Sequence, residues 1–251
     1  IIFSILLFLE LTIFILVKKL KKNFKWIITS EDELPNFEDE KLENFFKKNY
    51  SSELGWDRKA GSKGIEKNNE NISNFEISKN GFRKSNYNFK NSKIATFGDS
   101  YAFCRYVSDD ETWQYYLENE LKTHVRNYGV GNYGLDQAFL KFDQTELEKE
   151  NETIIFAVVP ETISRIHSYW KHYLEFGNIF SFKPKFTLNE SNEISKTNNF
   201  LLNQMNKKSI FENIGLVKKN DYFYTKKFRK RMFKFPFTLS LLKYPKLNIQ
   251  V

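Results

Sequence analysis

Three short apolar runs, each followed by glycine or polar residues, constrain the fold of this chain more than any other feature. They cover 94–97, a stretch that begins at His124, and 153–159. The segments between them, 108–121 and 136–150, place their apolar residues at helical spacing. Strand, helix, strand, helix, strand is the order of a parallel sheet that is covered by helices on both sides. We therefore predict an α/β fold.

The residues that follow the three runs indicate where a functional site would lie. Gly98-Asp99-Ser100 follows the first run, the glycine-rich stretch 127–134 follows the second, and Pro160-Glu161-Thr162 follows the third. Active sites of parallel sheets lie at the carboxyl ends of the strands. We therefore expect these three loops to form the site.

The first 17 residues are almost entirely apolar, and lysines follow them. A spanning helix needs about 20 apolar residues, whereas a cleavable signal peptide would continue into small residues at a cleavage site. We predict a transmembrane anchor over residues 1–22. A carboxylate is costly in lipid, but Glu10 is tolerable among its Leu, Ile and Phe neighbours, particularly if it faces a partner helix. A linker would cover 23–74 and a globular domain 75–251. The chain would be a single-pass membrane protein, and the membrane side of its domain stays open.

The net charge of +8 comes largely from two clusters, one after the apolar segment and one at 226–234. No nucleic-acid-binding motif accompanies either cluster, so no nucleic-acid partner is expected. The stretch 224–237 fits an amphipathic membrane-surface helix or an ordinary helix with a solvated basic face. Cys104 is the only cysteine, which excludes an intrachain disulfide. No cysteine, aspartate or glutamate stands at metal-ligand spacing beside His167 and His172. We therefore expect no metal, and we expect no cofactor.

Three motifs occur in the order of the predicted strand ends: Gly98-Asp99-Ser100, then Ser-Asp-Asp-Glu-Thr-Trp at 108–113, then Asn-Tyr-Gly-Val-Gly-Asn-Tyr-Gly-Leu-Asp-Gln at 127–137. Over about 81–173 the chain resembles the first half of an SGNH hydrolase, a superfamily also called GDSL esterases, in the branch met among bacterial surface-polysaccharide genes. The resemblance implies a three-layer α/β/α sandwich with a parallel sheet. It also implies that Ser100 attacks an ester carbonyl from a tight turn that Gly98 allows.

The resemblance assigns roles to further residues. The backbone N–H of Ser100 would stabilise the oxyanion together with a backbone N–H at Gly131 or Asn132, where Asn132 stands at the family's oxyanion glycine. The family's third donor is an asparagine side chain, which this chain lacks, and Thr162 is the substitute that we predict. Asp99 would anchor the loop by accepting backbone hydrogen bonds. Arg165, Lys183 and Lys185 are candidate contacts for an anionic sugar, and ordinary surface charge is the alternative interpretation of these three residues.

The proton acceptor of the family is a histidine in an Asp-x-x-His motif near the C-terminus. His124, His167 and His172 are the only histidines, and all three lie too early for that motif. The predicted domain is therefore expected to be truncated at its C-terminal end, with the motif beyond Val251. We interpret His167 and His172 as structural residues.

Together these features predict a serine esterase or an O-acyl transferase that acts on an acylated glycan or another small ester through an acyl-serine intermediate. Water as the acceptor would give hydrolysis, and a sugar hydroxyl would give acetyl transfer. One alternative is a catalytically degenerate, membrane-anchored glycan-binding or assembly protein with the same fold. A second alternative is a membrane-surface protein that acts through the basic cluster at 226–234.

Overall fold

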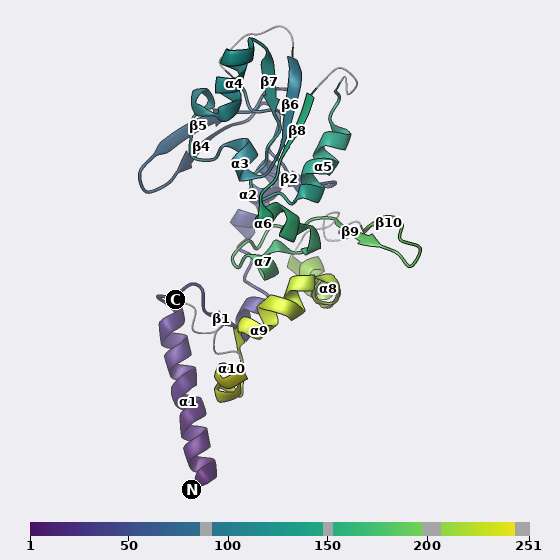
Figure 1. Ribbon diagram of the computed structural model, residues 1–251. Helices are drawn as coiled ribbons and strands as arrows, with labels where there is room; N and C mark the ends of the chain where they lie inside the picture. The colour runs from purple at the N-terminus through teal and green to yellow at the C-terminus, as the bar shows by residue number, and fades with distance from the viewer. Residues whose placement is uncertain (86–91, 148–152, 198–206, 244–251) are drawn as a thin grey trace. The chain divides into compact units, whose positions relative to one another are not determined.

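The computed structural model describes residues 1–85, 92–147, 153–197 and 207–243 (Figure 1). It contains two compact units. The sheet unit consists of Glu40–His167 and Phe182–Asn203, and the helical unit consists of Ile1–Asp39, Ser168–Ser181 and Gln204–Val251.

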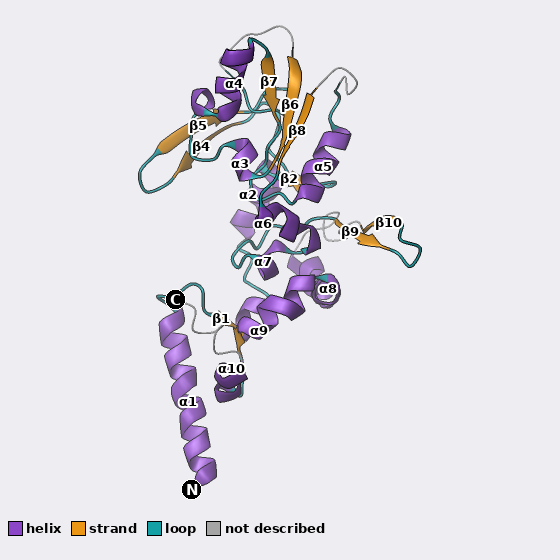
Figure 2. Cartoon of the chain, in the orientation of Figure 1, coloured by secondary structure: helices purple, strands orange, loops and turns teal. Residues whose placement is uncertain are grey.

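A three-stranded parallel sheet is the centre of the sheet unit (Figure 2). Its strands are β6 (Ser92–Gly98), β7 (His124–Asn127) and β8 (Thr153–Ala157), in the order β7-β6-β8. In register, Thr96 pairs with Asn127 and Gly98 pairs with Ala157. The predicted α/β class with a parallel sheet is confirmed, and the strand that carries Gly98-Asp99-Ser100 at its end lies in the middle.

Helices α4 (Trp113–Leu121) and α5 (Leu135–Gln144) pack on opposite faces of β6. On one face the Gln114 amide of α4 donates to the Thr96 hydroxyl at 3.1 Å. On the other face Phe97 packs against α5, because successive side chains of a strand point to opposite faces. The core cluster of this second face contains Ala95, Phe97, Tyr128 and Ala138. The chain runs from β6 to β7 on one side and then crosses β6 to reach β8 on its other side. The strand order therefore reverses at the carboxyl ends of β6 and β8, the kind of switch point at which α/β sheets bind ligands.

Short helices follow β6 and β8, the first and third strands of the parallel sheet in chain order. Ser100–Phe103 forms α3 directly after β6, and Pro160–Ser164 forms α6 after β8. Proline is at the start of α6, where its missing N–H costs no helical hydrogen bond. The 3₁₀ turn η3 (Arg165–His167) continues from α6.

The remaining elements of the sheet unit surround these strand ends. Trp56 and Tyr133 hold the loop after β7: the Trp56 indole donates to the Gly131 carbonyl at 3.0 Å, and the Tyr133 hydroxyl donates to the Trp56 carbonyl at 2.7 Å. Two hairpins are antiparallel, β4 with β5 and β9 with β10. The bounds are α2 (Asp39–Lys48), β2 (Tyr50–Ser51), β3 (Gly55–Trp56), β4 (Lys63–Lys67), β5 (Ile72–Glu76), η2 (Asp109–Glu111), β9 (Lys185–Leu188) and β10 (Ile194–Thr197).

The helical unit joins segments from the start, the middle and the end of the sequence. A two-residue parallel pairing connects Ile28 with Met232, and the buried Asp221 carboxylate accepts from the Tyr169 and Trp170 amides at 2.7 and 2.9 Å. The bounds are α1 (Ile2–Lys21), β1 (Ile28–Thr29), η1 (Ser30–Glu33), α7 (Lys171–Leu174), α8 (Lys207–Asn220), η5 (Tyr224–Phe228), α9 (Arg229–Arg231), β11 (Met232–Phe233) and α10 (Phe237–Lys243).

This division differs from the predicted boundaries. Residues 168–181 and 204–251 belong with the N-terminal segment, whereas the sequence prediction assigns them to one domain over 75–251. The predicted linker over 23–74 is also divided, since its residues from Glu40 onward are part of the sheet unit. The contacts of Asp221 and the pairing of Ile28 with Met232 explain the difference, because both join segments that are distant in sequence.

Helix α1 has a partner helix, α10, at Glu10. The Glu10 carboxylate accepts from the Phe237 amide at 2.5 Å and from the Thr238 amide at 3.0 Å, and so it caps the N-terminus of α10. The rings of Phe14 and Phe237 lie 5.7 Å apart. Among the described residues, however, no helix combines the length and apolar character that crossing a membrane requires. This finding does not bear out the transmembrane anchor predicted over 1–22, a segment in which α1 contains Glu10 and ends in lysines.

Candidate active site

The turn between β6 and α3 places Ser100 at the carboxyl end of the middle strand. Gly98 has a φ of +153°, and a Cβ at this position would lie 2.8 Å from the Ala157 carbonyl oxygen and 2.9 Å from the Ala102 Cβ. A side chain at residue 98 would therefore force the turn apart. The prediction that Gly98 allows a tight turn is confirmed, and Ser100 follows as the half-buried first residue of α3.

Asp99 anchors this turn, as predicted. Its carboxylate is buried and accepts from the Tyr101 amide at 2.9 Å, which caps the N-terminus of α3. The other carboxylate oxygen accepts from Arg165 Nη1 at 2.9 Å. The ion pair with Arg165 is additional to the backbone hydrogen bond expected from the sequence.

Arg165 joins all three strand ends, a structural role that was not predicted from the sequence. The side chain is buried, and its Nη1 donates to the Tyr133 carbonyl at 3.1 Å as well as to Asp99. Arg165 itself follows the third strand, Tyr133 belongs to the loop after the second strand, and Asp99 follows the first. A guanidinium can donate in several directions from one plane, so a single side chain fixes three loops.

Arg83 supports the other end of α3, and the sequence analysis did not identify it. Its Nη1 donates to the carbonyls of Phe103 and Cys104 at 2.7 and 2.8 Å, and its Nε donates to Asp109 at 2.6 Å. A helix of four residues cannot pair its own last carbonyls, so a buried arginine supplies the donors. No local pattern marks this role, because Arg83 lies 20 residues before Phe103.

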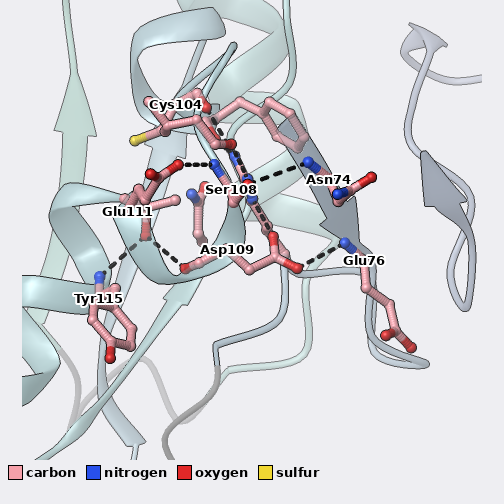
Figure 3. A network of polar contacts seen from close by, with 12 residues as sticks. Asn74, Glu76, Cys104, Ser108, Asp109, Glu111 and Tyr115 are labelled. Carbon is pink, nitrogen blue, oxygen red and sulfur yellow. Dashed lines mark hydrogen bonds and ion pairs between the residues drawn. The ribbon is translucent and has the colours of Figure 1, made fainter. Parts of the chain in front are cut away.

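The motif at 108–113 attaches strand β5 to the segment after α3 (Figure 3). The Ser108 amide donates to the Glu111 carboxylate at 2.7 Å, while the Asp109 carboxylate accepts from the Glu76 amide at 2.9 Å. The Asn74 amide donates to the Ser108 hydroxyl at 3.4 Å. These acidic residues therefore have structural partners.

Cys104, in the same region, has the character expected of a structural residue. Its thiol contacts the Gln114 side-chain oxygen at 3.2 Å. Burial raises the pKa of the thiol, which keeps it protonated and weakly nucleophilic.

The loop after β7 packs directly on α3 through Gly129. A Cβ on Gly129 would lie 2.3 Å from the Phe103 nitrogen, so a larger residue cannot occupy this position without moving the helix. The Val130 amide donates to the Gly98 carbonyl at 3.1 Å. The second loop is thereby held against the Ser100 turn.

The left-handed residue of this loop is Asn132 and not Gly131. Asn132 has a φ of +73°, a region that glycine occupies freely and that asparagine tolerates better than most other residues. A Cβ on Gly131 would meet only the Arg105 side chain, at 3.6 Å. The backbone shape of the expected oxyanion loop is thus compatible with asparagine at position 132.

Thr162 does not serve as the free donor that we predicted. It is buried, and its hydroxyl donates to the Val159 carbonyl at 2.6 Å and accepts from the Val159 amide at 3.2 Å. The hydroxyl closes the first turn of α6, so its only hydrogen is committed to the backbone.

Within the described ranges, the Ser100 hydroxyl has no hydrogen-bond partner. His124 is the first residue of β7, at the opposite end of the strand from the loop at 127–134, and it pairs with the buried Glu118. His167 is exposed and is the last residue of η3, two positions after Arg165. Of these two histidines, only His167 lies on the side of the sheet where the strand-end loops meet.

His172 is part of the helical unit and has the structural role that we predicted. Its Nε2 contacts the Asp32 carbonyl at 2.9 Å, and the Gly177 amide donates to its Nδ1 at 3.3 Å, which identifies Nε2 as the protonated nitrogen. Burial lowers its pKa to about 4. The ring is therefore neutral at pH 7 and stacks on Trp170 with ring centroids 4.6 Å apart.

A cavity of about 970 Å³ lies beside the strand ends in the sheet unit. One of its lining residues is Val158, which directly follows Ala157, the residue paired with Gly98. Asp136 is on its wall, where it forms a buried ion pair with Lys183, and burial raises the pKa of the Asp136 carboxyl. Most of the lining is apolar and comes from Leu135, Phe139, Phe156, Val158, Ile166, Leu188 and Ile194, with His167 and Lys185 among the polar members.

Residues that could hold a metal ion are not grouped in the part of the chain that the structure describes. The site therefore consists of a serine on a tight turn, two buried arginines that fix the short helix after it, a glycine contact with the second loop, and an apolar cavity. Comparison of the chain with protein-family models, with curated proteins and with solved structures gives no match.

Proposed function

We propose that the sheet unit is a serine esterase or O-acyl transferase domain in which Ser100 is the nucleophile. The observation that carries this proposal is the position of Ser100 at the carboxyl end of the middle parallel strand, as the first residue of α3. This is the switch point of the sheet. The motif resemblance to SGNH hydrolases supports the same role, with the three-layer sandwich as the proposed complete fold.

In the proposed reaction the Ser100 oxygen attacks the ester carbonyl carbon while a base takes the hydroxyl proton. The tetrahedral intermediate collapses, the carbon–oxygen bond to the alcohol breaks, and the alcohol leaves with a proton. Water or a sugar hydroxyl then attacks the acyl-serine, which gives hydrolysis or transfer. The Ser100 N–H and an N–H of the loop at Gly131 and Asn132 are the proposed oxyanion donors.

An acylated glycan is the proposed substrate, with the acyl group directed to the cavity that Val158 lines. The apolar lining of this cavity suits an acyl chain and excludes water from the ester. Membrane association through α1 is the proposed location, because apolar side chains of this helix are exposed along most of its length.

The surroundings of Ser100 support a second candidate function, which is binding without catalysis. No base contacts its hydroxyl within the described ranges, and the Thr162 hydroxyl is committed to Val159. A domain that kept the turn and lost the donors would bind an acylated glycan without cleaving it. This is the catalytically degenerate alternative.

The test uses the full chain and a fluorophosphonate probe, which reacts with activated serines. Wild type and Ser62→Ala should be labelled, whereas Ser100→Ala should lose both labelling and turnover of an acetylated glycan. Ser62 is a suitable control because its hydroxyl bonds to the Lys59 carbonyl in an exposed turn. Labelling that persists in Ser100→Ala would refute the nucleophile, and glycan binding by an unlabelled wild type would favour the binding function.

A further inference from the structure

A cavity of about 540 Å³ in the helical unit is lined by four cationic side chains. Arg229 and Lys230 come from α9, Lys234 from the segment after β11, and Lys243 from the end of α10. No carboxylate is among the described residues that line it. Positive charges gathered around one hollow of the surface attract a multiply charged anion such as phosphate.

Apolar side chains surround this basic cavity. Leu239 is on its wall and is 58% exposed, and Phe235 is also on the wall and is 71% exposed. Leu242, on the same helix as Leu239, is 77% exposed. Large apolar groups at such exposure mark a surface that binds another apolar body. A free phosphate ion would leave them in water.

Glu10 connects the wall of the cavity to the apolar helix α1. By capping the N-terminus of α10, its carboxylate fixes α10 beside α1, and Phe14 contacts Phe237 in the same interface. The apolar side chains of α1 from Ile1 to Leu9 are between 43% and 99% exposed. Lysines 18 and 19 in the last turn of α1 are also exposed. Apolar and basic groups therefore occur together, as they do in elements that lie at the surface of anionic membranes.

We propose that the cavity lined by Arg229, Lys230, Lys234 and Lys243 binds the phosphate of an anionic phospholipid headgroup while α1 and α10 contact the acyl chains of the same lipid surface. This site is separate from the proposed esterase activity, since all of its residues belong to the helical unit.

The experiment compares two double variants of the full chain that remove the same charge. Arg229→Gln/Lys234→Gln changes the cavity, and Lys219→Gln/Lys226→Gln changes two exposed lysines of the same unit that do not line it. Flotation measures binding to phosphatidylcholine vesicles with and without phosphatidylglycerol, over a series of salt concentrations. Circular dichroism checks that both variants are folded. If the first variant does not fold, Lys230→Gln alone takes its place.

The expected result is preferential binding of wild type to the phosphatidylglycerol vesicles. This preference should fall by about thirtyfold in the cavity variant, because each basic residue near an anionic surface contributes about fivefold, and by less in the control variant. Equal losses in the two variants would overturn the proposal in favour of general charge attraction. Absence of any preference for phosphatidylglycerol, with or without calorimetric binding of inorganic phosphate to the chain, would also overturn it.

Discussion

The carboxylate of Asp99 accepts a hydrogen bond from Arg165 Nη1 at 2.9 Å, and both side chains are buried. Because Asp99 precedes Ser100, this ion pair fixes the residue that begins the proposed nucleophile turn. Arg165 also donates to the Tyr133 carbonyl, so the pair connects the loops that follow all three parallel strands.

Replacing Arg165 with alanine should destabilise the sheet unit by about 3–5 kcal/mol, since it leaves the Asp99 carboxylate buried without its partner. Chemical unfolding followed by circular dichroism measures the change. Arg105→Ala is the control, because Arg105 is 36% exposed in its ion pair with Glu66 and should change stability by about 1 kcal/mol or less. Equal costs for the two variants would show that the Asp99 pair has no special structural role.

Replacing Gly129 with alanine should displace α3, because the added Cβ would lie 2.3 Å from the Phe103 nitrogen. The expected cost in stability is about 1–3 kcal/mol, together with loss of fluorophosphonate labelling at Ser100. The control is Gly215→Ala in α8, whose Cβ would meet no atom within 4 Å. Comparable labelling of the two variants would contradict the direct packing of Gly129 on α3.

His172 should make the stability of the helical unit depend on pH. Its pKa is about 4 in the folded chain because of burial, against an ordinary value of 6.5. Between pH 4 and pH 6.5, His172 is protonated in the unfolded chain and neutral in the folded chain. The contribution of neutral His172 to the free energy of unfolding is therefore fully present above about pH 6.5. It decreases as the pH falls toward 4, by about 3 kcal/mol in total.

The His172→Gln variant isolates this effect. Glutamine keeps a donor for the Asp32 carbonyl and an acceptor for the Gly177 amide, but it does not titrate. The difference in unfolding free energy between wild type and variant should change with pH over this window. Subtraction is needed because burial raises the pKa of Asp221, which changes stability in the opposite direction as the pH falls. A constant difference would mean that His172 is accessible to protons in the folded chain.

Replacing Glu10 with alanine should loosen α10, since the Phe237 and Thr238 amides lose their acceptor. Hydrogen exchange of the segment 235–243 should become about fivefold faster, as expected for loss of a helix cap. Glu31→Ala serves as the control, because the Glu31 side chain is 87% exposed. Unchanged exchange in Glu10→Ala would show that hydrophobic packing alone holds α10.

The local sequence was sufficient to predict the parallel sheet, the tight turn at Gly98 and the anchoring role of Asp99. Continuous apolar runs form the buried strands, and their alternation with helical segments predicts parallel pairing. The turn and the cap depend on immediate neighbours, since a carboxylate one residue before a helix caps it. The sequence also marked Glu10 as a residue that needs hydrogen-bond donors, because a carboxylate among apolar residues is costly without them.

Tertiary structure decided the residues that hold the site together. Arg83 and Arg165 lie 20 and 66 positions from partners that they contact, so no periodicity relates them and neither structural role was predicted. The same holds for the two units, because Asp221 and the pairing of Ile28 with Met232 bring distant segments together. Sequence patterns therefore determined the strands and the turn that carries Ser100, whereas long-range ion pairs and hydrogen bonds, which depend on the folded path of the chain, determined how the three loops meet.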